Sequence, residues 1–185
     1  MPTPLLRMAV AAVIAFGLDR FSKIVIVHWL DLSSVQVIHV WPPYLDLVMA
    51  WNTGVNFGLL GDYGGRWMLV AFAIIFSVAI AIWTRHKSGW VLPLSVGIAV
   101  GGALGNAFDR VVYAAVADYL NMSCCGIRNP YSFNVADVFV FCGMVLVAIS
   151  LERRSGTDSH SFSDSNVIPR ARRSRNKGAG SNAQP

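Results

Sequence analysis

The sequence predicts an α-helical integral membrane protein with four transmembrane helices and a small β-rich element outside the membrane. Of its 185 residues, 55% are hydrophobic and only 14% are charged, whereas about a quarter of a soluble domain is charged. Four apolar stretches, at residues 5–30, 67–84, 89–108 and 135–151, come close to or exceed the roughly 20 residues that cross a bilayer. We therefore expect much of the surface to face lipid.

The first stretch, residues 5–30, is apolar except for Arg7 and a polar insert that begins at Asp19 and ends at Lys23. A cleaved signal peptide would have a shorter apolar core and a small-residue cleavage site. The stretch therefore indicates a transmembrane helix that is retained. Asp19 and Lys23 are four residues apart and share one helical face, where they can form an ion pair.

Residues 31–66 have a different pattern. Residues 35–41 and 44–51 alternate like two short strands, broken by Pro42 and Pro43. Five glycines, at positions 54, 58, 61, 64 and 65, indicate turns. This segment is expected to be an extramembrane β-rich element, and its tryptophans suit a membrane interface.

Three further spans and a tail complete the chain. In residues 89–108, Gly97, Gly101 and Gly105 step by four, a spacing that lets two helices approach closely in lipid. We assign these glycines a structural role. After the last span, residues 155–185 are rich in Ser, Arg, Gly and Asn, which predicts a disordered basic tail following a membrane domain of residues 1–154.

The positive-inside rule places both termini and the turn at residues 85–87 in the cytoplasm, and segments 31–66 and 111–133 outside. Polar residues that are scattered along the sequence then fall at one membrane depth. These residues are Asp19, Lys23, Asn52, Asn106, Asp109, Arg110, Asp118, Asn134 and Asp137. Ionisable residues at membrane depth usually face the interior of a helix bundle.

Structural explanations compete with functional ones for several of these residues. Asp19 and Lys23 could be only an ion pair, and Asp109 is best explained as part of a polar cluster that ties the third span to its neighbours. Asn134 and Asp137 have the spacing of a helix N-cap and first turn. The four histidines are dispersed and the three cysteines lack metal-ligand spacing, which disfavours a His-based triad or a zinc site. Adjacent Cys124 and Cys125 are not expected to bridge each other.

Asp118 and Asp137 suggest chemistry because they are the only acids between residues 110 and 151, and each lies at the mouth of the predicted bundle. Two close carboxylates share one proton. The ionised acid can take a proton from water, and the protonated acid can hydrogen-bond to the carbonyl oxygen of a peptide. The pair therefore predicts peptide-bond hydrolysis.

The sequence resembles the lipoprotein signal peptidase, or signal peptidase II, family. The resemblance rests on five motifs in order: LDRFSK at 18–23, WNTGVNFG at 51–58, GGALGNAFDR at 101–110, VADY at 116–119 and FNVAD at 133–137. It implies an aspartic endopeptidase of the bacterial inner membrane, with its active site at the periplasmic face. Such an enzyme removes the signal peptide of a diacylglyceryl-modified prolipoprotein just before the lipidated cysteine.

By position, the resemblance implies that Asp118 and Asp137 are catalytic. It assigns substrate-binding or supporting roles to Asp19, Lys23, Asn52, Gly54, Asn106, Arg110 and Asn134. It also implies that 31–66 is a β-cradle and that part of 111–133 is a short periplasmic helix. The resemblance implies no metal or cofactor. It implies that the cyclic peptide globomycin would inhibit the protein, and that the protein would be a monomer among membrane lipids. Asn56, Tyr119 and Val138 depart from the family pattern, which affects only details of the pocket.

Other classes of protein predict different patterns. A small transporter would place its polar residues near mid-membrane on broken helices with paired repeats. A non-catalytic assembly protein would use the glycine steps and leave both acids dispensable. Nucleic-acid binding is a lesser alternative, because seven of the fifteen basic residues lie at Arg153 or later, in a tail that suits an anionic membrane surface.

Overall fold

The computed structural model describes residues 3–54, 61–87, 89–127 and 129–164. The chain divides into two compact units, Met1–Leu151 and Glu152–Pro185. The first unit contains a bundle of helices and a sheet. The predicted basic tail falls in the second unit, where residues 165–185 lie outside the described part of the chain.

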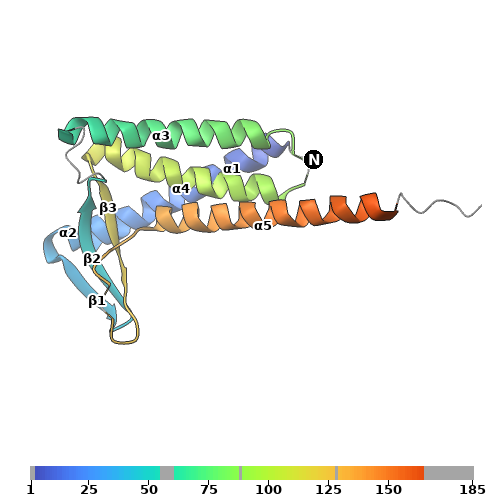
Figure 1. The fold of residues 1–185 in the computed structure, drawn as a ribbon. Helices are drawn as coiled ribbons and strands as arrows, with labels where there is room; N and C mark the ends of the chain where they lie inside the picture. The colour runs from blue at the N-terminus through green and yellow to red at the C-terminus, as the bar shows by residue number, and fades with distance from the viewer. Residues whose placement is uncertain (1–2, 55–60, 88, 128, 165–185) are drawn as a thin grey trace, which may run out of the picture. The chain divides into compact units, whose positions relative to one another are not determined.

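Four long helices form the bundle: α1 (Pro4–Lys23), α3 (Gly61–Thr84), α4 (Val91–Tyr113) and α5 (Val135–Asp164). Figure 1 shows them running alongside one another, with the sheet at one end. Within the described residues, three segments are long and apolar enough to cross a membrane: Gly64–Thr84, Val91–Tyr113 and Val135–Arg153. α1 is absent from this set, and its apolar run is interrupted by Arg7, Asp19, Arg20 and Lys23.

Small residues let the helices approach closely. A Cβ atom added at Gly97 or Gly101 of α4 would collide with backbone carbonyl oxygens of α1. On another side of α4, a Cβ at Gly102 would lie 2.5 Å from the carbonyl oxygen of Ala136 in α5. α4 is therefore the central helix, packed by its glycines against α1 and α5.

A three-stranded antiparallel sheet with the order β1-β2-β3 is built from segments far apart in the sequence. β1 (Val37–Trp41) and β2 (Leu45–Asn52) agree with the two predicted strands, and β3 (Val116–Met122) pairs with β2. The short helix expected within 111–133 is wrong, since the described residues of that range hold the end of α4, β3 and non-helical segments. Pairing with β2 makes residues 116–122 extended.

One face of the sheet buries apolar side chains against the segment that comes after α1. This segment is a π-helix, η1 (Ile24–Trp29), and a short helix, α2 (Leu32–Val35). The core at this contact contains Leu32, Leu47 and Tyr119, of which Leu32 and Tyr119 are fully buried. The core fixes β3 relative to the end of α1 and so positions the residue between its two buried neighbours, Asp118.

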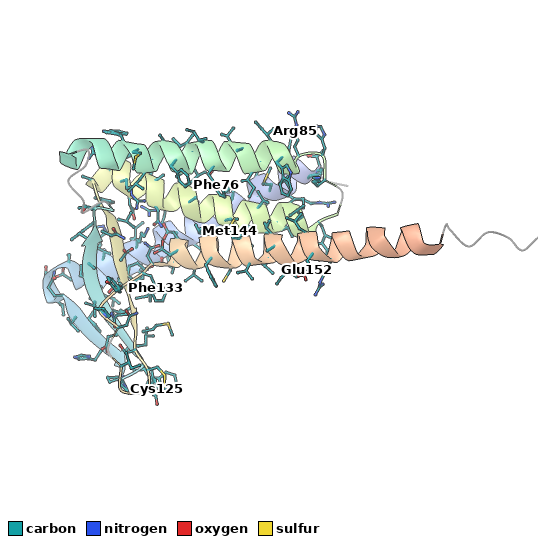
Figure 2. All side chains as sticks on the ribbon, viewed as in Figure 1. Phe76, Arg85, Cys125, Phe133, Met144 and Glu152 are labelled. Atoms are coloured by element: carbon teal, nitrogen blue, oxygen red, sulfur yellow. A yellow bond between two sulfur atoms is a disulfide. The ribbon has the colours of Figure 1, made fainter. Side chains whose placement is uncertain are left out.

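Several boundaries differ from the sequence-based expectations. α3 begins at Gly61, so the glycines at 61, 64 and 65 lie in a helix and not in turns. α5 extends from the predicted end at residue 151 to Asp164, into the first part of the predicted tail. Cys124 and Cys125 are joined in a disulfide, contrary to expectation. Figure 2 labels Cys125 at the end of the sheet farthest from the helices, and Arg85 at the opposite end of the bundle.

Candidate active site

Asp118 lies in β3 with only 3% of its surface exposed. The side-chain amide of Asn52 donates to its Oδ2 at 3.0 Å, and that of Asn134 donates to its Oδ1 at 2.5 Å. Burial raises the pKa of the Asp118 carboxyl; the Asn52 hydrogen bond lowers it, and the negative charge of Asp137 raises it again. The net shift is upward, so Asp118 holds a proton more readily than a solvated aspartate does.

Asp137 lies in the first turn of α5. Its Oδ2 accepts from the backbone N–H of Asn134 at 3.1 Å, and its own N–H donates to Asn134 Oδ1 at 3.1 Å. This reciprocal pair is the predicted cap, with aspartate in the position that glutamate takes in a capping box. The N-terminal end of a helix stabilises negative charge, so the first turn of α5 is a suitable place for an ionised carboxylate.

Asn134 is the one residue that contacts both acids among the hydrogen bonds of the described residues. It is fully buried, its side-chain amide donates to Asp118, and its backbone N–H donates to Asp137. The cap of α5 therefore fixes the position of one carboxyl group relative to the other.

Asn106 connects this pair to a second polar cluster. Its Nδ2 donates to Asp137 Oδ1 at 2.7 Å, and its Oδ1 accepts from Lys23 Nζ at 3.3 Å. Lys23 can only donate, so it holds the amide of Asn106 with the oxygen toward Lys23 and the N–H group toward Asp137.

The second cluster consists of two acids and two cations from α1 and α4. Lys23 Nζ lies 2.6 Å from Asp109 Oδ2 and 3.1 Å from Asp19 Oδ1. Arg20 pairs with the same two acids, at 2.5 Å from Asp109 and 2.7 Å from Asp19. Asp19, Asp109 and Lys23 are buried. The four charges balance, which makes their burial tolerable and ties α1 to α4.

Asp19 also accepts from the backbone N–H of Ala136 at 3.1 Å. Asp19 belongs to α1, so this hydrogen bond ties α1 directly to the first turn of α5. A Cβ at Gly105 of α4 would lie 2.7 Å from Asp19 Oδ2, which is too close for a real side chain. Gly105 leaves the room that this contact requires.

Arg110 lies beside the acids, and Gly54 lies beside Arg110. Arg110 interacts electrostatically with Asp137 and Asp118, and its Nη1 donates to the carbonyl oxygen of Asn106 at 3.3 Å. Gly54 has a φ of +93°, which favours glycine. A Cβ at this position would lie 3.7 Å from Arg110 Nη2 and would collide with Leu69.

Tyr119 is fully buried next to Asp118 in β3, and its hydroxyl lies 2.7 Å from Ser22 Oγ. Burial raises the pKa of Tyr119 to about 12. The hydroxyl therefore stays protonated at neutral pH and links β3 to α1.

The polar residues predicted to share one membrane depth lie in a connected network. It runs from Asp109 through Lys23, Asn106, Asp137 and Asn134 to Asp118 and Asn52.

The site predicted from the sequence omitted Arg20 and Tyr119. A cation within an apolar stretch was the signal that could have identified Arg20. Asn56 lies outside the described residues. Among those residues, no group of three or more His, Cys, Asp or Glu side chains is arranged to hold a metal.

Comparison with known proteins places these observations in a family context. The family described as "Signal peptidase (SPase) II" matches residues 11–153 of the chain. A lipoprotein signal peptidase of Rhodopseudomonas palustris is 36% identical over 147 residues, covering 77% of this chain and 89% of that protein. One of Methylobacterium radiotolerans is 34% identical over 171 residues, covering 91% and 99% respectively.

Two solved structures of bacterial membrane enzymes have the same fold. One matches with a TM-score of 0.64 at 23% identity, over 81% of this chain and 90% of that one. The other matches with a TM-score of 0.67 at 24% identity, over 78% and 91%. These similarities show that the bundle and its sheet have the fold of these membrane enzymes.

Proposed function

The chain belongs to the signal peptidase II family of aspartic peptidases, and on that premise we propose that Asp118 and Asp137 are its catalytic dyad. The relatives are lipoprotein signal peptidases, so the substrate is a prolipoprotein whose signal peptide is removed. We further propose that the substrate carries a diacylglyceryl group on its cysteine and is cut just before that residue.

The observation that carries the proposal is the position of Asn134 between the two carboxyl groups. One buried residue donates to Asp118 at 2.5 Å and to Asp137 at 3.1 Å. A pair held in this way can share one proton and bind one water molecule, as hydrolysis by two aspartates requires. Within the pair the proton is favoured on Asp118, whose pKa is raised by burial.

The proposed reaction uses the two acids in different protonation states. Ionised Asp137 takes a proton from water as the oxygen attacks the carbonyl carbon of the scissile peptide bond. Asp118 gives its proton to the carbonyl oxygen, and a tetrahedral diol forms. Asp118 then takes back the proton of one hydroxyl group, Asp137 delivers its proton to the amide nitrogen, and the C–N bond breaks.

The charged residues around the pair support these protonation states. Asp19, Asp109, Arg20 and Lys23 are balanced among themselves. Arg110 interacts electrostatically with both Asp118 and Asp137. Lys23 also acts on Asp118, but its charge is already balanced by Asp19 and Asp109. One positive charge beside two carboxyl groups that share a proton leaves the site neutral, which suits a partly buried location.

Four spans in the bacterial inner membrane, with both termini in the cytoplasm, would place the sheet and the dyad at the periplasmic face. In this arrangement α1 is one of the four spans, in addition to the three long apolar helices, and its Arg20 and Lys23 pair with Asp109 of α4. The enzyme would act as a monomer among membrane lipids, without a metal or cofactor, and would bind globomycin at the dyad.

The test compares Asp118→Asn, Asp137→Asn and Asp31→Asn in the purified full-length enzyme. Asp31 is exposed and away from the network, in a left-handed conformation that asparagine also adopts. We expect both dyad variants to lose cleavage of a diacylglyceryl prolipoprotein, and Asp31→Asn to retain it. Mass spectrometry of the product should find the lipidated cysteine at its N-terminus.

Cleavage by either dyad variant at the wild-type rate would remove the proposed mechanism. A product that begins at another residue would overturn the proposed cleavage site while leaving the dyad in place. Equal cleavage of a precursor without the diacylglyceryl group would overturn the proposed substrate chemistry.

A further inference from the structure

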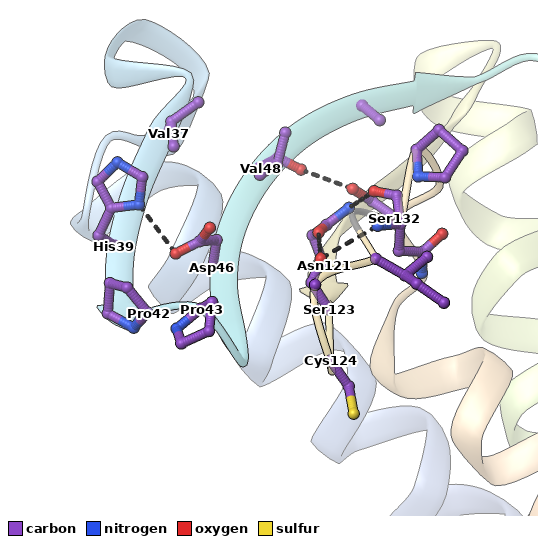
Figure 3. A pocket seen from close by; sticks show the side chains of 15 residues that line it. Val37, His39, Pro42, Pro43, Asp46, Val48, Asn121, Ser123, Cys124 and Ser132 are labelled. Atoms are coloured by element: carbon purple, nitrogen blue, oxygen red, sulfur yellow. Dashed lines mark hydrogen bonds and ion pairs between the residues drawn. The ribbon is translucent and has the colours of Figure 1, made fainter.

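A groove of about 590 Å³ lies on the extramembrane sheet (Figure 3). Val37 and His39 of β1 line one side, and Asp46, Val48 and Ala50 of β2 form the floor. The opposite side is the segment between β3 and α5, which includes Ser123 and Ser132. The dyad residues do not line this groove, so it is a separate feature of the fold.

The groove leads to the dyad from two directions. Ala50, at one end of its floor, pairs directly with Asp118 across β2 and β3. Paired residues in adjacent strands point to the same face of a sheet, so Ala50 and Asp118 share a face locally. A register irregularity between Leu47 and Ala50 separates this pair from the Asp46–Asn121 pair at the other end of the floor. Ser132, on the far side, is two residues before Asn134 and donates to the carbonyl oxygen of Val48 at 3.2 Å. The wall of the groove therefore continues into the residue that contacts both acids.

The other end of the groove lies away from the helices. Pro42 and Pro43 line it there, beyond the start of β2, whereas Asn52 at the end of β2 pairs with Val116, close to the end of α4. From Asp46 to Ala50 an extended chain covers about 13 Å. The groove thus has room for an extended peptide segment of about four residues, directed away from the bundle.

The far wall is built as a defined surface. Asn121 of β3 donates to the carbonyl oxygens of Asn129 at 2.9 Å and Tyr131 at 3.1 Å. Asn129 in turn donates its backbone N–H to Ser123 Oγ at 3.1 Å. These bonds hold the segment in shape without a contribution from a substrate, as a preformed binding wall requires.

We propose that this groove binds the segment of the prolipoprotein that comes after the lipidated cysteine. The inference rests on the proposed function, because it takes the scissile bond to lie at Asp118 and Asp137. The apolar signal peptide stays with the membrane helices, and the segment after the cysteine is the part that leaves the membrane. A groove that begins beside Asp118 and runs away from the bundle matches that part of the substrate.

The charge of the groove favours some residues over others in the substrate segment that follows the cysteine. Asp46 is the only acid among the described lining residues, and it pairs with His39 Nδ1 at 2.9 Å. Both side chains are partly exposed, so the pair can exchange partners at small cost. Lysine or arginine after the cysteine is therefore favoured over glutamate or aspartate.

The experiment measures kcat/KM of the full-length enzyme in lipid vesicles with two lipidated precursors. One ends at the cysteine, and the other continues for about eight further residues, about 26 Å when extended. Val37→Trp fills the groove. Val40→Trp is the matched control, because Val40 lies on the same strand with similar exposure (54% against 41% for Val37) but does not line the groove.

We expect the wild-type enzyme to cleave the long precursor about tenfold more efficiently than the short one. Val37→Trp should bring this ratio close to one, and Val40→Trp should preserve it. The ratio is independent of how much of each variant is folded, because both precursors meet the same preparation. A wild-type ratio near one, or an equal loss in both variants, would overturn the inference.

Asp46→Lys provides a second, independent measurement. The wild-type enzyme should favour a long precursor with lysines after the cysteine over one with glutamates, and Asp46→Lys should reverse the order. An unchanged order in Asp46→Lys would contradict the groove assignment. Failure of the wild-type enzyme to cleave either lipidated precursor would instead remove the proposed function, and the inference with it.

Discussion

Asn106 offers the sharpest test of how the network supports the proposed dyad. It donates to Asp137 at 2.7 Å while Lys23 holds its oxygen at 3.3 Å. Asn106→Leu removes the donor and keeps the approximate size of the side chain. Asn106→Asp keeps the shape but replaces the donor with a second acceptor facing Asp137.

The size of the effect can be worked out from these contacts. A hydrogen bond to a charged group contributes about 1.5–3 kcal/mol, so Asn106→Leu should lower kcat/KM by about 10- to 150-fold. In Asn106→Asp, two ionised carboxylates about 2.7 Å apart would repel each other by about 6 kcal/mol at an effective dielectric constant of about 20. Lys23 offsets part of this repulsion, and a proton must be bound to relieve the rest. We therefore expect Asn106→Asp to lose more activity than Asn106→Leu.

The assay is cleavage of a diacylglyceryl prolipoprotein by purified variants, with thermal unfolding measured in parallel. Ser150→Ala, at a half-buried position of α5 whose hydroxyl donates only to the carbonyl oxygen of Leu146 among the hydrogen bonds of the described residues, serves as the control. If Asn106→Asp cleaves as fast as Asn106→Leu or faster, the assigned orientation of the amide is wrong, and Asn106 does not donate to the dyad.

Three other substitutions probe the same site. Asn52→Ala removes the hydrogen bond that lowers the pKa of Asp118, so the dyad should keep its shared proton to higher pH. The basic limb of the pH profile of kcat/KM should therefore move to higher pH, and a move to lower pH would contradict the assignment. Gly105→Ala places a methyl group against Asp19 and should destabilise the fold by about 1–3 kcal/mol, which lowers the Tm measured in detergent. An unchanged Tm would show that the contact can relax. Lys23→Met leaves the buried acids Asp19 and Asp109 with one cation fewer and should lower the free energy of unfolding by about 3–5 kcal/mol, measured by denaturant unfolding. A stability close to that of the wild type would mean that Arg20 alone neutralises the two acids.

The sequence predicted the membrane bundle and the set of polar residues because both depend on local patterns. Apolar stretches mark the helices, and polar residues near the same end of neighbouring helices come close together once the helices pack side by side. The cap of α5 was also predictable, since Asn134 and Asp137 are neighbours along the chain and form a reciprocal pair in the structure.

The parts that sequence reasoning missed depend on distant partners. Residues 116–122 become a strand because β2 lies beside them, and strand propensity depends strongly on such neighbours. Arg20 finds Asp109 across 89 positions of sequence, so the pairing could not be predicted from spacing. The glycines near residue 61 have low helix propensity, and α3 forms there nonetheless, since packing against α4 can outweigh about 1 kcal/mol per glycine.

The cap of α5 has a consequence beyond catalysis. Because Asn134 starts the helix and also aligns the two acids, fraying of a single helical turn would disassemble the proposed dyad while the rest of the bundle stayed intact. A compound that binds preferentially to this unwound turn would shift the population toward an inactive enzyme. It would do so without occupying the place of the prolipoprotein at the proposed dyad. A higher concentration of substrate would relieve the inhibition only to the extent that substrate binding itself favours the helical form of this turn.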